Sequence, residues 1–222
     1  NWKVLTLLVM ATTIGGLYRN GIMTLFPFIQ AEYSLSKTQI GLYSTFIYLS
    51  SVSMAVFSGW IADSWGTKKA MFAGLSSMGI FIFLHSLSIS FNLMLILAAG
   101  AGLGLSILQP TGSKGATDWF AKENRATVVG MVSLGISLGG VISASTLPWS
   151  ASVLGWKKTI VILSFVYLIF SFAFLFLYKD RKKGKEKKEH KNTSLIKSFS
   201  VLITNKKLLA LCFLGIVFGV SS

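Results

Sequence analysis

Apolar runs about 20 residues long recur along nearly the whole chain, and this pattern restricts the fold more than any other feature of the sequence. An α-helix of that length crosses the hydrocarbon core of a bilayer. The first six runs cover residues 4–29, 39–61, 70–89, 93–115, 127–149 and 158–178, and a seventh begins at 208. With 53% hydrophobic and 13% charged residues, the chain is also too apolar for an ordinary soluble domain of its size. We therefore predict an all-α integral membrane protein that crosses the membrane several times.

The predicted domains follow from these runs. They are a six-helix transmembrane bundle over 1–178, a basic linker over 179–207 and the start of a seventh helix over 208–222. The chain begins at Asn1 without an initiator Met, and its first run is too long for the h-region of a signal peptide. Because the seventh run is cut short after about 15 residues, we expect the sequence to be part of a longer protein.

The basic residues lie mostly on one side of the alternating runs. Of the 21 Lys and Arg residues, 11 lie in the linker over 179–207. Those that flank the same side are Lys3, Lys68, Lys69, Lys114, Lys122 and Arg125, and those on the other side are Lys37, Lys157 and Lys158. Positive loops mark the cytoplasmic face, which places the N-terminus and the linker inside. The linker also suits anionic lipid headgroups, but it lacks interleaved aromatic residues for base stacking, so we expect no nucleic-acid partner.

The sequence contains no apparatus for hydrolysis or phosphoryl transfer. It has no Gly-rich phosphate loop, nucleophile elbow or paired carboxylates. Cys212 alone forms neither an internal disulfide nor a zinc site, and His85 and His190 lack a second ligand one helical turn away. We therefore predict that the chain is not an enzyme and uses no metal or cofactor.

One arginine, Arg19, lies near the middle of the first apolar run. It lies about 22 Å from the predicted cytoplasmic start of the helix, too deep for the guanidinium to reach the membrane surface comfortably. An Arg at the bilayer centre costs about 2.5–3.5 kcal/mol on insertion scales, so it normally pairs with another group or lines a water-filled cavity. The first six runs contain no Asp or Glu. The compensating partner of Arg19 must therefore come from elsewhere.

Three explanations of Arg19 remain open. It binds an anionic substrate, it pairs with a segment beyond this chain, or the span boundary is misplaced. We favour a substrate anion, because the fixed fork of guanidinium donors suits a carboxylate or phosphate. Tyr18 and Asn20 flank it and offer a hydroxyl and an amide. Gln109 is a further candidate, because a buried amide needs partners and the adjacent Pro110 frees a backbone carbonyl.

Small residues recur at helical spacing in the fourth and fifth runs. They are Gly102, Ser106, Gln109 and Ser113 in the fourth, and Gly130, Ser133, Ser137, Gly140 and Ala144 in the fifth. Such faces let helices approach closely or line a wet path. Close packing is the more common role.

The segment GWIADSWGTKK, residues 59–69, resembles the cytoplasmic loop signature of the major facilitator superfamily. The residues that match are Gly59, Asp63, Gly66 and Lys68. Ser64 and Thr67 stand where the family usually has basic residues. The first glycine permits close helix contact, the second permits a tight turn, and the aspartate can accept from a helix N-terminus or pair with a cation.

A second loop, TDWFAKENRATVVG at 117–130, also resembles that family, with Asp118 preceding Arg125. The resemblance implies that Arg125 lies near Asp63 and that these residues, with Lys68 and the two glycines of the signature, form a cytoplasmic gate. It also implies that the chain is the first half of a twelve-helix transporter. Such a half consists of two inverted three-helix repeats, and substrate binds near the midplane between the halves.

Within the superfamily, YRNGIMTLFPFI at 18–29 resembles the anion-transporting branches, which are the organic anion/cation symporters and the organophosphate/phosphate exchangers. The segment DWFAKENRA at 118–126 is closer to the symporters. The fifth run, with GISLGGVISASTLP, lacks the Gly-Pro pattern of the drug antiporters, which favours uptake or exchange. The symporters often have a coupling carboxylate in the fourth span, which is missing here, so coupling residues would lie beyond this chain or His85 would serve.

We predict a secondary transporter that moves a small organic anion, namely a carboxylate, sugar acid or phosphate ester, by alternating access. A proton or sodium is the expected coupling ion, and the inner membrane of a bacterium the expected location. Arg19 is the predicted anion ligand, and Tyr18, Asn20 and Gln109 are predicted to line the site with it. The alternatives are a drug or metabolite exporter in which Arg19 is structural, and a non-transporting membrane scaffold or sensor.

Overall fold

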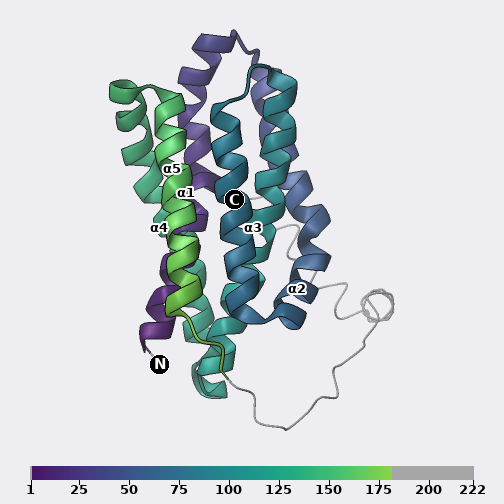
Figure 1. Ribbon diagram of the computed structural model, residues 1–222, viewed down its shortest axis with the longest axis vertical. Helices are drawn as coiled ribbons and strands as arrows, with labels where there is room; N and C mark the ends of the chain where they lie inside the picture. The colour runs from purple at the N-terminus through teal and green to yellow at the C-terminus, as the bar shows by residue number, and fades with distance from the viewer. Residues whose placement is uncertain (1, 182–222) are drawn as a thin grey trace. The chain divides into compact units, whose positions relative to one another are not determined.

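The computed structural model describes residues 2–181 of the 222-residue chain and shows an all-helical bundle (Figure 1). Its elements are α1 (Trp2–Tyr33), α2 (Lys37–Ser86), α3 (Phe91–Trp119), the short 3₁₀ helix η1 (Lys122–Asn124), α4 (Arg125–Leu154) and α5 (Trp156–Leu177). The predicted all-α class is confirmed. The number of membrane spans, the inverted repeats and the domain boundaries stay predictions. The predicted seventh helix, and the predicted linker beyond its first residues, lie outside the described residues.

Helix α2 consists of two rods that meet at Gly66. The backbone of Gly66 has φ of 79° and ψ of 166°, which no helix interior contains. Residues with a side chain strongly disfavour this region, so glycine is needed for the chain to turn here. The first rod begins at a capping box, in which the Ser36 hydroxyl accepts from the Gln39 N–H and the Gln39 side chain accepts from the Ser36 N–H. The tight turn that the sequence predicts at Gly66 is confirmed.

Four helical stretches in the described part of the chain are long and apolar enough to cross a membrane. They are Phe57–Ser86, Phe91–Trp119, Lys122–Leu154 and Trp156–Leu177. Large apolar side chains are exposed along α4 and α5, for example Leu134, Val141, Trp149, Ile169 and Phe176. Water-soluble proteins rarely expose so much apolar surface, whereas lipid tails accept it. Helix α1 is not in this set, because Arg19 and its polar neighbours make it less apolar.

Backbone contact between α1 and α4 determines how closely these two helices pack. A Cβ added at Gly139 would overlap the carbonyl oxygen of Thr13 and lie 2.9 Å from the Cα of Gly16. A Cβ added at Gly16 would likewise overlap the carbonyl oxygen of Ile136. Small residues at such crossings are the usual means by which helices associate in membranes. This contact places α1, the helix that carries Arg19.

The close-packed face of α4 differs from the face that the sequence spacing suggests. The buried residues of α4 are Val128, Val132, Gly135, Gly139, Ser143, Leu147 and Ala151. Of the expected stripe, Ser137 is exposed, and a Cβ at Gly130 would meet no described atom within 4 Å. Because glycines lie on two faces of this helix, spacing alone could not identify the face that contacts α1.

The end of α1 is tied to the start of α5. The Glu32 carboxylate accepts a hydrogen bond from Trp156 Nε1 at 2.6 Å and forms an ion pair with Lys157 at 2.5 Å. Hydrogen bonds from Lys157 and then Trp156 hold the pKa of the Glu32 carboxyl below its usual range. Tyr33 adds an edge-on ring contact with Trp156. These contacts hold together the ends of two helices that are far apart in the sequence.

Candidate functional site

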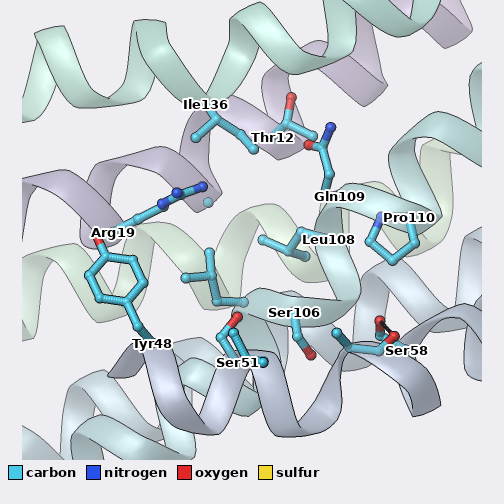
Figure 2. Close-up of a pocket in the computed structure, with 14 residues that line it drawn as sticks. Thr12, Arg19, Tyr48, Ser51, Ser58, Ser106, Leu108, Gln109, Pro110 and Ile136 are labelled. Atoms are coloured by element: carbon cyan, nitrogen blue, oxygen red, sulfur yellow. Dashed lines mark hydrogen bonds between the residues drawn. The ribbon is translucent and has the colours of Figure 1, made fainter. Parts of the chain in front are cut away.

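A cavity of about 500 Å³ lies between α1, α2, α3 and α4 (Figure 2). Its wall consists of Thr12, Gly15 and Arg19 from α1, Tyr48, Ser51, Val52, Ala55 and Ser58 from α2, Leu105, Ser106, Leu108, Gln109 and Pro110 from α3, and Ile136 from α4. The volume lies within the range of roughly 300–1,000 Å³ typical of small-molecule sites. Its polar groups are a guanidinium, an amide and several hydroxyls.

Arg19 is the one charged residue among the described wall residues. It lies near the middle of the 32-residue α1, about 26 Å along the helix from its start. Its guanidinium carbon is 5.9 Å from the centre of the Tyr48 ring, within cation–π range. Among residues 2–181, no carboxylate forms an ion pair with Arg19. The guanidinium therefore enters the cavity without an anionic partner from the described chain (Figure 2).

Gln109 enters the same cavity from α3. Its Nε2 donates to the Ser133 hydroxyl of α4 at 2.9 Å. Its Oε1 is buried and has no hydrogen-bond partner within residues 2–181. The next residue, Pro110, also lines the cavity and has no N–H to donate to the carbonyl of Ser106 one turn earlier. Helix α3 therefore brings to the cavity wall a side chain with one acceptor, Oε1, whose hydrogen-bonding capacity is unused within residues 2–181.

Tyr18 and Asn20 are not part of the cavity wall. Tyr18 is buried in the core, where its hydroxyl lies 3.0 Å from the hydroxyl of Tyr43. Asn20 is exposed, and its side chain lies against Gly140 of α4. Successive residues of an α-helix point about 100° apart, so the two neighbours of Arg19 face away from the cavity. The structure thus brings together two of the four predicted substrate residues, and the roles of all four stay predictions.

A buried hydrogen-bonded chain links α1, α2 and α5 outside the cavity wall. The Tyr43 hydroxyl lies 3.3 Å from His85 Nε2 and contacts the Tyr18 hydroxyl on its other side. The Tyr167 hydroxyl accepts from the Tyr18 N–H at 3.1 Å and donates to the carbonyl of Ile14. His85 is therefore part of a network that holds helices together, and it does not line the cavity.

Sequence reasoning did not identify the wall that α2 contributes. Tyr48, Ser51, Ala55 and Ser58 all line the cavity, and Tyr48 contacts the Arg19 guanidinium. Their spacing of three or four residues places them on one face of a helix. Polar residues at this spacing in the second apolar run were the signal that could have found them.

The residues of the loop signature make contacts that differ in part from those the resemblance implies. Asp63 forms an ion pair of 2.7 Å with Lys114, whose ammonium also donates to the carbonyl of Ala62 at 2.6 Å. Within residues 2–181, no ion pair joins Asp63 to Arg125, which is exposed at the start of α4. The close helix contact expected at Gly59 is not present, because a Cβ there would meet no described atom within 4 Å.

Lys68 and Asp118 form hydrogen bonds through their main-chain atoms. The Lys68 N–H donates to Asp180 Oδ1 at 3.1 Å, so this carboxylate lies at the N-terminus of the second rod of α2. The main-chain carbonyl of Asp118 accepts from Arg181 Nη1 at 2.8 Å. These contacts join α5 and the start of the linker to α2 and α3. The gating roles predicted from the two loops stay predictions; the residues concerned are Gly59, Asp63, Gly66, Lys68, Asp118 and Arg125.

The groups that line the cavity are able to bind a hydroxylated anion. A guanidinium binds a carboxylate through charge and paired hydrogen bonds, and an amide and hydroxyls bind hydroxyl groups. Within residues 2–181, no three His, Cys, Asp or Glu side chains are grouped so as to hold a metal ion.

The sequence model of the protein family described as the Major Facilitator Superfamily matches residues 8–222 of this chain. A hexuronate transporter of Bacillus subtilis is 30% identical over 172 residues, which are 76% of this chain and 40% of that protein. A galacturonate transporter of Dickeya chrysanthemi is 27% identical over 190 residues, which are 83% of this chain and 54% of that protein. A crystal structure of a bacterial homologue of the human lysosomal transporter Spinster, inward-facing and unoccupied, has a TM-score of 0.69 at 19% identity and covers 91% of this chain and 49% of its own.

This chain spans about half the length of the curated relatives that it matches. The similarity to the solved structure supports the same fold. Together with the apolar helices, these matches identify an integral membrane protein that crosses the membrane several times.

Proposed function

The chain belongs to the Major Facilitator Superfamily, and we propose that its cavity binds the substrate of a secondary transporter for small organic anions. One observation supports this most strongly: Arg19 enters the cavity without an anionic partner among residues 2–181. A guanidinium this deep in a membrane helix is costly unless a compensating group or water reaches it. A bound carboxylate provides that compensation through two parallel hydrogen bonds.

The proposed substrate is a sugar acid of about the size of a hexuronate. By their descriptions, the two relatives above are transporters of hexuronate and of galacturonate. The cavity of this chain has one cation for a carboxylate, and the Gln109 amide and the hydroxyls of Tyr48, Ser51 and Ser106 for the other groups of such a molecule. Its volume of about 500 Å³ has room for a six-carbon acid and some water.

The substrate crosses by alternating access, in which the two halves of such a transporter rock around a central site. The Asp63–Lys114 ion pair links α2 to α3 at the loops where the proposed cytoplasmic gate lies. A proton or sodium drives the transport. The distribution of positive loops supports a cytoplasmic N-terminus, and the proposed location is the inner membrane of a bacterium.

Arg19→Gln in the full-length protein tests the assignment, because it keeps a polar side chain and removes the charge. Arg181→Gln is the matched control, since Arg181 is exposed and lies outside the cavity wall. Thermal unfolding in detergent is measured with D-galacturonate, with its neutral methyl ester and without ligand. A ligand at a hundredfold excess over its Kd raises the free energy of unfolding by about 2.7 kcal/mol, which such an assay resolves.

We expect galacturonate to stabilise the wild type and Arg181→Gln, but not folded Arg19→Gln, and the ester to stabilise none of them. Proteoliposomes with the wild type should take up labelled galacturonate saturably. If Arg19→Gln keeps the stabilisation, or if the ester matches galacturonate, Arg19 is structural and the anion assignment fails. Absence of saturable flux for any tested solute would instead favour a membrane scaffold.

A further inference from the structure

The side-chain amide of Gln109 has one end bonded and one end free. Its Nε2 is held by the Ser133 hydroxyl of α4 at 2.9 Å, and its Oε1 is buried without a hydrogen-bond partner in the described chain. A buried acceptor without a partner has lost its hydration and gained nothing in return. Because Gln109 lines the cavity, a molecule bound there can supply the missing hydrogen bond once it reaches this oxygen.

No other buried atom of the described cavity wall is in this state. Of the buried side-chain nitrogen and oxygen atoms that line it, Gln109 Oε1 alone lacks a partner. The Ser58 and Ser106 hydroxyls donate to carbonyls of their own helices, those of Ala55 and Leu103. Among the buried side-chain atoms of the described wall, the unpaired acceptor therefore belongs to Gln109.

We propose that Gln109 determines substrate specificity by accepting a hydrogen bond from a substrate hydroxyl, and that Ser133 is its positioning residue. This inference rests on the proposed function, because Arg19 must hold the carboxylate while Gln109 binds another part of the same molecule. An ionised carboxylate can only accept, so it binds the guanidinium and not Oε1, whereas a hydroxyl can donate to Oε1. Figure 2 shows both side chains entering the cavity, from α1 and from α3.

The hydrogen bond to Ser133 fixes the orientation of the Gln109 amide. Because the Nε2 donor end is bonded to Ser133 on a neighbouring helix, rotation of the amide would break this bond. Oε1 therefore stays available for the substrate. An acid with a hydroxyl within reach of Oε1 binds more tightly than the same acid without it, because the second leaves the buried acceptor unpaired. We expect a difference of about tenfold in Kd.

The test compares D-galacturonate with its mono-deoxy analogues, and Kd is measured by isothermal titration calorimetry on the full-length protein in detergent. Gln109→Met removes both hydrogen bonds of the amide at similar side-chain size. Gln30→Met is the matched control, because the Gln30 amide lies outside the cavity wall and donates to the carbonyl of Leu35. Ser133→Ala removes only the positioning bond, and Ser137→Ala changes an exposed serine one turn further along α4.

In the wild type and both controls, we expect at least one mono-deoxy analogue to bind about tenfold more weakly than galacturonate. In Gln109→Met, the Kd of galacturonate should rise by about the same factor, while that analogue keeps its wild-type Kd. The ratio of the analogue's Kd to that of galacturonate should then fall to about one. Ser133→Ala should lower the ratio in the same direction by a smaller factor. A purely structural role for Gln109 would lower stability without changing this ratio.

Two results would overturn the inference and leave Arg19 as anion ligand. In the first, Gln109→Met weakens galacturonate and every analogue equally. In the second, the ratio of the analogue's Kd to that of galacturonate stays at its wild-type value in Gln109→Met and in Ser133→Ala. If Gln109→Met does not fold, the result for Ser133→Ala decides. A wild type that binds galacturonate no better than its methyl ester refutes the proposed function, and this inference with it.

Discussion

Gly139→Ala should destabilise the protein, although alanine is the better helix former. Replacing a mid-helix glycine by alanine gains about 1 kcal/mol of helix propensity. At this position the new Cβ would overlap the carbonyl oxygen of Thr13 and lie 2.9 Å from the Cα of Gly16. Carbon atoms in contact normally lie about 3.5–4.0 Å apart, so α1 would have to move by about 1 Å.

The atoms that the new methyl group meets belong to the backbone and cannot rotate away. Overpacking of this kind costs about 1–3 kcal/mol, and we expect the upper end of that range here. The net loss of stability is then about 2 kcal/mol. Gly130→Ala is the matched control on the same helix, because its Cβ would meet no described atom within 4 Å. It should stabilise the protein by up to about 1 kcal/mol.

Thermal unfolding of the two full-length variants in the same detergent measures the difference. We expect the Tm to increase in the order Gly139→Ala, wild type, Gly130→Ala. Because Arg19 lies one turn along α1 from Gly16, Gly139→Ala should also weaken galacturonate binding. A Gly139→Ala variant as stable as Gly130→Ala would show that α1 and α4 do not approach as the structure has them.

In a thermal melt, Gly66→Ala should destabilise the protein by about 1–3 kcal/mol, because φ of 79° and ψ of 166° are strained for alanine. The control Gly59→Ala should be neutral or stabilising. Equal effects of the two substitutions would contradict the turn at Gly66. Lys114→Met should lower the free energy of unfolding by about 1 kcal/mol, because it removes two hydrogen bonds from a largely buried ammonium. Glu32, whose pKa is lowered by Lys157, should stabilise the protein above the usual pKa of a glutamate, and this contribution should be lost as pH falls through the lowered value. Glu32→Gln should therefore reduce the acid dependence of Tm, and an unchanged pH profile would refute this.

Features that belong to single segments could be predicted from the sequence. The apolar runs predict helices because every run of that composition and length must satisfy its own backbone in a membrane. The turn at Gly66 was predictable because only glycine readily adopts the backbone conformation found there. That Arg19 needs a compensating partner could be inferred from its depth in an apolar run without acids, and its role as anion ligand stays a prediction.

The partners of these residues could not be predicted in the same way. Lys114 and Arg125 both lie in or next to the loop at 117–130, so the sequence allows either of them as the ion-pair partner of Asp63. Only the packing of α3 against α2 selects Lys114. Tyr18 adjoins Arg19 in the sequence but points elsewhere, since neighbours on a helix point about 100° apart.

The sequence by itself determined that this protein is a helical membrane bundle with an arginine near the middle of its first helix, because composition and periodicity belong to each segment separately. The tertiary structure decided which side chains surround that arginine. Tyr48 and Gln109 share a cavity with Arg19 because α2 and α3 are rotated to face α1. That rotation depends on contacts between distant residues, such as Gly139 against Thr13. It follows from how all the helices pack together, which no single segment specifies.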